Sequence, residues 1–95
     1  MGKVIGTVVA SQKDYRLDGL KLLLLEQVTS DMKLTGSTVV AVDSVGAGID
    51  EIVLYAAGSS ARLTDVTENK PVDTVIVAIV DTVEKGGKYT YQKAG

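Results

Sequence analysis

The chain of 95 residues contains no cysteine, histidine, tryptophan or phenylalanine, and only one proline. Without histidine or cysteine, neither a Ser-His-Asp nor a Cys-His catalytic centre can form. The same absence removes the usual ligands of zinc, haem iron and iron–sulfur clusters. Disulfides are excluded as well, so a chain this small must be stabilised by its core or by partner subunits. We therefore expect no enzyme, no metal site and no bound cofactor.

Long apolar runs are also missing. The longest strongly apolar run extends from Val75 to Val80, whereas a membrane-spanning helix needs about 20 residues. The stretch from Val4 to Ala10 is interrupted and lacks the cleavage site of a secretory signal. Ten basic and twelve acidic residues give a formal net charge of −2. We expect one domain over residues 1–95, in the cytoplasm and without a role at a membrane.

The chain contains fifteen valines. Together with isoleucine and threonine they favour strands, because β-branched side chains pack well on a pleated surface. The leucine-rich stretch 20–28 is ambiguous between helix and strand. We assign it to a strand because no capping box precedes it and its neighbours are strands. The expected main strands cover residues 3–10, 20–28, 37–45, 51–57 and 72–83.

Two further signals complete the expected fold. Ser59 or Ser60 can cap a short helix over residues 58–63, before the last main strand. The pair Gly86-Gly87 predicts a two-residue hairpin turn, because both central positions of a type I′ turn need positive φ. The sequence thus predicts an all-β fold, a small five-stranded OB-like β-barrel with a short helix and a C-terminal hairpin.

The strands 20–28 and 72–83 do not alternate between apolar and polar residues. Val75, Val77 and Ile79 have one parity, and the residues of the other parity are apolar too. A strand in the barrel of a single small domain should have one face in contact with water. Burying an exposed Val or Leu side chain stabilises a protein by roughly 1.5–3 kcal/mol. The pattern favours an oligomer. The alternative is that the short helix and the hairpin cover the outer faces within one chain.

Three short motifs resemble ligand-binding or catalytic sites, but a structural role is favoured for each. Gly46-Ala47-Gly48 resembles the start of a dinucleotide fingerprint, but the third glycine and the following helix are missing, so a tight turn is favoured. The segment from Gly58 to Arg62 could bind an anion, although a helix cap with a structural arginine pair is favoured. The carboxylates Asp50 and Glu51 are expected to be solvated, because nothing in the sequence indicates a catalytic cleft.

An OB-like barrel raises a binding module for single-stranded nucleic acid as the alternative function. Such modules combine a basic groove with stacked aromatic residues. Here the basic residues are scattered, the net charge is negative, and the one close cluster lies on the expected hairpin around Tyr89 and Tyr91. Nucleic acid is therefore not an expected partner. A mobility shift at low salt would distinguish this alternative.

Three segments carry a specific resemblance to a known family. They are the stretch 6–11 near the start, the stretch 42–62 containing Gly46-Ala47-Gly48 and Gly58-Ser59-Ser60-Ala61-Arg62, and the stretch 71–81 beginning Pro71-Val72-Asp73. In this order and spacing the chain resembles the EutN/CcmL family, the vertex proteins of bacterial microcompartment shells such as the carboxysome. The resemblance extends from about Lys3 to Tyr91.

The resemblance implies a cyclic homopentamer with no enzymatic activity and no cofactor. Family members cap the fivefold vertices of a polyhedral shell in the bacterial cytoplasm, in contact with hexameric and pseudohexameric shell proteins. A flat sheet of sixfold tiles cannot close, so fivefold units supply the curvature. A head-to-tail interface between subunits closes into such a ring when its rotation divides the circle.

We expect the subunit or shell interface in three places. The turn and the capped segment are candidates because the resemblance is tightest there, and the last main strand is a candidate because both its faces are apolar. Which of the first two segments faces a neighbour is left open by the sequence. The candidate residues are Gly46, Ala47, Gly48, Gly58, Ser59, Ser60, Ala61, Arg62, Val75, Val77 and Ile79.

Overall fold

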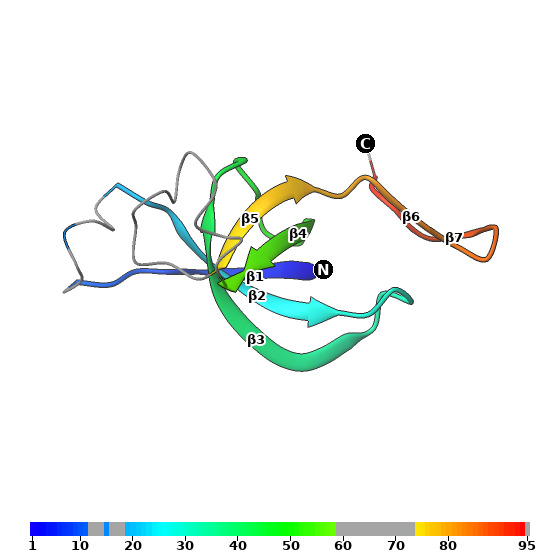
Figure 1. The fold of residues 1–95 in the computed structure, drawn as a ribbon, viewed down its shortest axis with the longest axis horizontal. Helices are drawn as coiled ribbons and strands as arrows, with labels where there is room; N and C mark the ends of the chain where they lie inside the picture. Colours follow the sequence, from blue (N-terminus) through cyan, green and yellow to red (C-terminus); the bar gives the residue numbers. More distant parts are fainter. Residues whose placement is uncertain (12–14, 16–18, 59–73, 95) are drawn as a thin grey trace.

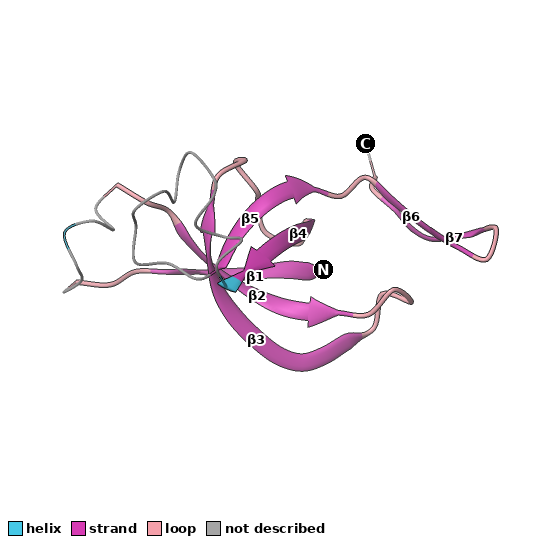
Figure 2. Cartoon of the chain, viewed as in Figure 1, coloured by secondary structure: helices cyan, strands magenta, loops and turns pink. Residues whose placement is uncertain are grey.

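Five strands close into a barrel with the neighbour order β1-β2-β3-β5-β4 (Figure 1). The computed structural model describes residues 1–11, 15, 19–58 and 74–94. Figure 2 shows the strands of the barrel joined by loops, with a small helical piece drawn beside the β2 label. The predicted five-stranded OB-like barrel is confirmed. Its strands are β1 (Gly2–Val8), β2 (Leu22–Val28), β3 (Leu34–Asp43), β4 (Ile52–Ala57) and β5 (Thr74–Ile79).

The barrel closes by antiparallel pairing, except between β3 and β5, which run parallel with Val42 opposite Val75. The strand pair that closes the barrel joins β1 to β4, and in it Gly2 lies opposite Val53. A Cβ atom on Gly2 would come within 3.2 Å of both the Leu25 side chain and the Tyr55 ring. A side chain at this position would therefore require Leu25 or the Tyr55 ring to shift by a few tenths of an ångström.

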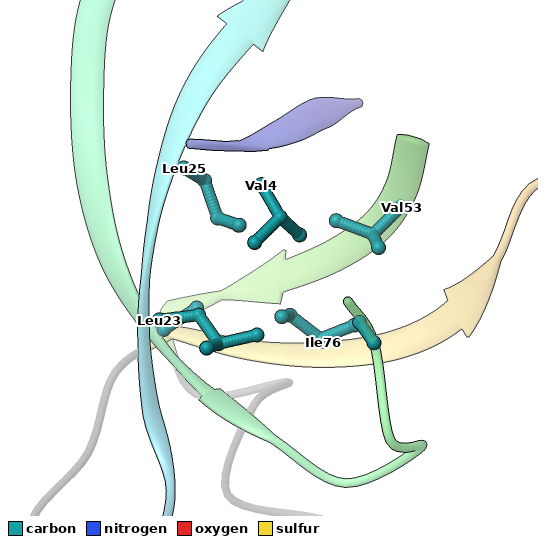
Figure 3. Packing of buried hydrophobic residues seen from close by; sticks show 7 residues of the cluster. Val4, Leu23, Leu25, Val53 and Ile76 are labelled. Atoms are coloured by element: carbon teal, nitrogen blue, oxygen red, sulfur yellow. The ribbon is translucent and has the colours of Figure 1, made fainter. Parts of the chain in front are cut away.

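The core fills the barrel interior with alternate residues of each strand. Val4, Leu23, Leu25, Val53 and Ile76 point toward one another in Figure 3, and each is at most 1% exposed. The period-two alternation of a strand brings every second side chain inside. The leucine-rich stretch thus forms a strand, as predicted, because its alternate leucines fit the barrel interior.

A second, smaller cluster lies on the opposite face of these strands. Val42 and Val75 are buried, with Leu20, Leu22 and Ala56 packed against them. Val42 directly follows the core residue Ala41, so the two side chains point to opposite faces. Part of the outer apolar surface is therefore covered within one chain. None of these residues belongs to the predicted helix or the hairpin, which the alternative to the oligomer had named as the cover.

The predicted strand 72–83 is interrupted in the structure. β5 ends at Ile79, and a new strand, β6 (Thr82–Lys85), pairs with β7 (Lys88–Gln92) in a separate two-stranded sheet. The break lies at Asp81, whose carbonyl accepts a hydrogen bond from the Lys93 N–H at 2.7 Å. The glycine turn is confirmed, since Gly86 and Gly87 have φ values of 61° and 82°.

This hairpin, residues 82–92, is called the arm below. It projects away from the barrel in Figure 1 and makes the described chain elongated, with extents of 45 × 25 × 24 Å. The predicted short helix over residues 58–63 lies, apart from Gly58, outside the described residues. No helix within the described part of the chain is long and apolar enough to span a membrane.

Candidate assembly surface

The connection between β3 and β4 is built around one carboxylate. Asp43 Oδ1 accepts hydrogen bonds from the backbone N–H groups of Val45, Gly46 and Ala47 at 3.0, 3.1 and 3.2 Å. The Asp43 side chain is 2% exposed, with Lys21 Nζ 4.0 Å away. Ser44 Oγ donates to the Ile76 carbonyl at 2.6 Å. This network fixes the glycine-containing turn against the barrel, which supports the tight-turn interpretation of Gly46.

Ala47 lies inside the barrel. Its side chain is 1% exposed and belongs to the main hydrophobic cluster with Val4 and Val53. Its side chain is therefore buried within one chain, so a contact of Ala47 with another subunit, which stays a prediction, would have to involve its backbone. The flanking Gly46 is exposed and Gly48 is half-buried, so both stay candidates for an interface.

Glu51 joins this connection to the chain beyond the arm. Its Oε1 accepts the Gly48 N–H at 2.5 Å, and its Oε2 accepts from Lys93 Nζ at 2.6 Å. The hydrogen bond from Lys93 lowers the pKa of Glu51, and the same bond raises the pKa of Lys93. Asp50 is exposed and lies 3.7 Å from Lys3 Nζ. The two carboxylates therefore have separate cationic partners rather than a shared catalytic cleft.

Two sides of the barrel expose large apolar side chains. The β1–β2–β3 wall consists of the exposed Ile5 and Val40 and the half-buried Leu24, which lies opposite Val40 in the register. The β4–β5 wall consists of Leu54, 45% exposed, and Val77, 43% exposed. In the closed strand order, one strand separates β2 from β4 on one side and from β5 on the other. The two walls therefore lie across the barrel from each other.

The three interface candidates on β5 differ in their burial. Val75 is fully buried within the chain, so its place at a subunit interface stays a prediction that its side-chain burial does not favour. Val77 is exposed, and Ile79 is half-buried against the core. A register shift between Leu54 and Tyr55 breaks the simple parity of β5. A bulge places an extra residue in one strand and redirects the side chains that follow.

The remaining sequence candidates lie at the end of β4. Gly58 is exposed, with a φ of 69°, and Ser59, Ser60, Ala61 and Arg62 lie outside the described residues. No group of three or more Asp, Glu, His or Cys residues in the described ranges could hold a metal ion.

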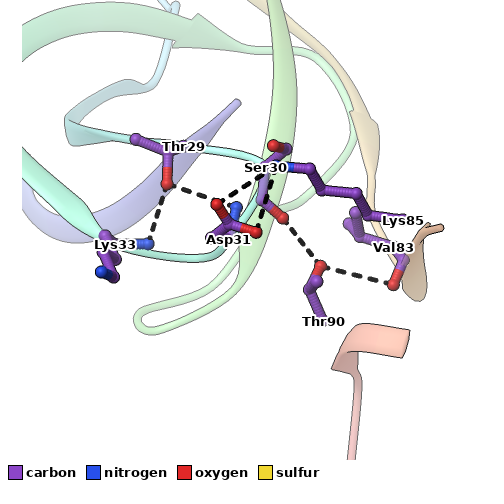
Figure 4. Close-up of polar contacts among 7 residues, drawn as sticks. All are labelled: Thr29, Ser30, Asp31, Lys33, Val83, Lys85 and Thr90. Atoms are coloured by element: carbon purple, nitrogen blue, oxygen red, sulfur yellow. Dashed lines mark hydrogen bonds and ion pairs between the residues drawn. The ribbon is translucent and has the colours of Figure 1, made fainter. Parts of the chain in front are cut away.

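The arm is held to its own barrel by polar contacts, which sequence reasoning missed (Figure 4). Lys85 Nζ lies 3.2 Å from Asp31 Oδ2, and Thr90 Oγ1 donates to the Ser30 carbonyl at 2.8 Å. Both partners belong to the turn between β2 and β3. Partners this far apart in the sequence leave no local signal. By contrast, Asp43-Ser44 with Gly46 two residues later is a recognisable turn pattern.

Comparison with known proteins identifies the family. A sequence model of the family described as ethanolamine utilisation protein EutN/carboxysome matches residues 1–81. The shell vertex protein GrpN of Rhodospirillum rubrum is 49% identical over 84 residues, covering 88% of this chain and 94% of the relative. The carboxysome shell vertex protein CcmL of Gloeobacter violaceus is 43% identical over 93 residues, covering 98% and 93%.

Solved structures agree with these relatives. The structure of CcmL from Gloeobacter violaceus superposes with a TM-score of 0.93, covering 97% of this chain and 95% of that chain. GrpN, described as a pentameric microcompartment shell protein from Rhodospirillum rubrum, superposes with a TM-score of 0.81 at 49% identity, covering 88% and 95%. The chain therefore belongs to the EutN/CcmL family, and both of these relatives are shell vertex proteins.

Proposed function

We propose that five copies of this chain form a ring that caps the fivefold vertices of a bacterial microcompartment shell. The observation that supports it most is the likeness over almost the whole chain to shell vertex proteins, one of them described as pentameric. The protein is a structural component rather than an enzyme, in the shell of a compartment in the bacterial cytoplasm.

The two apolar walls supply the ring interface. A head-to-tail ring needs two different patches on each subunit, one for each neighbour. Ile5, Leu24 and Val40 form one patch, and Leu54 and Val77 form the other. Removing apolar surface from water contributes about 25 cal/mol per Å². The β1–β2–β3 wall of one subunit therefore packs against the β4–β5 wall of the next.

Hexameric shell proteins are the partners at the rim of the ring. Gly46 is exposed and stands on a turn held by the Asp43 carboxylate, and Gly58 is exposed at the end of β4. Small residues on a fixed turn let another backbone approach closely. We assign the contact with hexamers to these segments, with Arg62 and the residues between it and Gly58 as their continuation.

A nucleic-acid module receives no support from the relatives compared here, which are all shell proteins. The acidic balance of the chain opposes phosphate binding as well, because such binding depends on neutralising phosphate charge with Lys and Arg.

Native mass spectrometry of the purified protein tests the ring. The expected species has five subunits, and Leu54→Asp and Leu24→Asp should each shift it toward monomers, because a carboxylate would be buried in the seam without a partner. Val9→Asp is the matched control, since Val9 is 93% exposed and belongs to neither wall. A stable monomer of the parent protein would refute the ring.

Co-expression with hexameric shell proteins, followed by electron microscopy, tests the vertex role. Closed shells should form with this chain and show corner gaps without it. A Gly46→Asp variant should still form pentamers yet leave the gaps. Pentamers that never occupy corners would contradict the vertex assignment.

A further inference from the structure

Two carboxylates bind four successive backbone N–H groups in the connection between β3 and β4. Asp43 accepts from residues 45, 46 and 47, and Glu51 accepts from Gly48. Residues 45–48 are called the amide turn below. Hydrogen bonds from N–H groups to an ionised carboxylate are stronger than those between neutral groups. The amide turn therefore depends on two side chains, one before it and one after it.

These two carboxylates differ in how firmly they are held. The Asp43 side chain is 2% exposed, and the Asp43 backbone N–H donates to the Lys21 carbonyl at 2.9 Å. The Glu51 side chain is 22% exposed. The Glu51 main chain is fixed to β1, because its carbonyl accepts from the Val4 N–H at 3.0 Å. Movement at this end of the amide turn therefore involves the Glu51 side chain, which a further contact can control.

Lys93, directly after the arm, supplies that contact. Its Nζ donates to Glu51 Oε2 at 2.6 Å, while Glu51 Oε1 accepts the Gly48 N–H. A Cβ atom on Gly48 would lie 3.3 Å from Glu51 Oε1, so glycine lets the carboxylate lie close to the backbone. The Lys93 N–H donates to the Asp81 carbonyl at 2.7 Å, where the arm joins the barrel. One carboxylate thus links the amide turn to the base of the arm, which consists of Asp81 and Lys93.

We propose that Glu51 is the positioning residue of the amide turn and that Lys93 controls it, so that the base of the arm and the amide turn are coupled. The consequence for shells rests on the proposed function, in which the segment around Gly46 contacts hexameric shell proteins. A coupling between two sites is reciprocal. Displacement of Lys93 loosens the amide turn, and a partner seated on the turn strengthens the bond between Glu51 and Lys93.

Amide exchange with water, measured by NMR on the full-length protein at neutral pH, tests the coupling. In Lys93→Met the Gly48 N–H should exchange about two- to fivefold faster than in the parent, as expected for the loss of a partly exposed ion pair. The Gly46 N–H should keep its rate, because Asp43 still accepts from it. Lys93→Arg should restore the parent rate at Gly48, because the guanidinium group also donates to a carboxylate.

Lys3→Met is the matched control. It removes the lysine that lies 3.7 Å from Asp50, the carboxylate next to Glu51 in the sequence. The N–H groups of the amide turn bind Asp43 and Glu51 rather than Asp50, so the Gly48 rate should stay unchanged. An unchanged Gly48 rate in Lys93→Met would overturn the proposal. Equal acceleration at Gly46, or in Lys3→Met, would overturn it as well, because either result indicates general loosening.

Shell closure tests the consequence for docking. Lys93→Met should form the same oligomer as the parent in native mass spectrometry. On co-expression with hexameric shell proteins it should leave a larger fraction of shells with corner gaps, whereas Lys3→Met should close shells like the parent. If the parent leaves all corners open, the proposed vertex role is refuted, and the exchange rates still decide the coupling. If the parent and Lys93→Met close shells equally well, the vertex role stands and the control of docking by Lys93 is refuted.

Discussion

The barrel and the arm of this protein are stabilised in different ways. The barrel has a closed set of strands around a cluster of seven buried residues. Asp43 accepts hydrogen bonds that hold the connection between β3 and β4. The arm has no buried residue and is attached through contacts such as Lys85 with Asp31 and Thr90 with Ser30. Burial supplies most of the stabilisation of the barrel, whereas exposed polar contacts of the kind that hold the arm contribute little free energy. The arm is therefore expected to open more easily than the barrel.

The largest effect is expected in the barrel core. Leu25→Ala should lower the free energy of unfolding by about 2–5 kcal/mol, because it removes a fully buried side chain and leaves a cavity. Denaturant unfolding followed by circular dichroism measures this. Leu34→Ala is the control, since Leu34 is 50% exposed and its truncation should cost much less. Equal losses for the two variants would show that the barrel interior is not the stabilising core.

A smaller loss is expected at the carboxylate that holds the turn. Asp43→Ala leaves three backbone N–H groups without their acceptor and should destabilise the barrel by about 1–3 kcal/mol. Asp43→Asn should retain much of the stability, because the amide oxygen still accepts hydrogen bonds. Thermal unfolding of both variants checks this ordering. An Ala variant as stable as the parent would show that the network contributes nothing.

The next prediction tests whether the arm and the barrel unfold independently. Gly87 has a φ of 82°, so Gly87→Val should destabilise the hairpin turn by about 1–2 kcal/mol. Amide hydrogen exchange should become faster in β6 and β7 and stay unchanged in β2, because the turn strain does not reach the barrel. Equal acceleration in β2 would mean that the arm and barrel unfold as one unit.

The smallest effect concerns the ion pair between Glu51 and Lys93. The lowered pKa of Glu51 means that its stabilising contribution is present above its ordinary value of 4.5 and is lost as the pH falls through the lowered pKa. The raised pKa of Lys93 means that its contribution is present below the ordinary value of 10.5 and is lost as the pH rises through the raised pKa. The pair therefore holds the chain end at neutral pH.

Carboxyl NMR titration measures this pair directly. Lys93→Met should raise the pKa of Glu51 toward its ordinary value, because the donated hydrogen bond is lost. Lys88→Met removes a lysine charge elsewhere in the C-terminal segment and should leave Glu51 unchanged. A Glu51 pKa that stays low in Lys93→Met would assign the shift to the Gly48 N–H instead.

The sequence predicted the fold because its signals are local. β-branched residues and the glycine pair at the hairpin each favour one backbone conformation over a few residues, and the ambiguous leucine-rich stretch is assigned from its strand neighbours. The assignment of residues 20–28 to a strand is confirmed by β2, and the glycine turn by the φ values of Gly86 and Gly87. The family resemblance is confirmed by the match over residues 1–81.

The candidate interface was harder to predict because exposure is decided by distant partners. In the sequence, Ala47 and Val75 cannot be told apart from residues that line a surface. In the structure, packing buries both. The exposed pair Leu54 and Val77 emerges only after β4 and β5 are paired with a register shift. Gly46, Gly48, Gly58 and Arg62, with the residues around them, stay predictions for the interface.

The sequence by itself determined that this chain is a valine-rich, all-β domain with no residues for redox or nucleophilic-triad chemistry and with more apolar strand surface than one barrel needs. Only the tertiary structure decided where that surplus lies: one part is covered within the chain around Val42 and Val75, and another part lies on two opposite walls that include the exposed Val40, Leu54 and Val77. The physical reason is that residue type sets the tendency to leave water, whereas strand order and register set which neighbour removes each side chain from it.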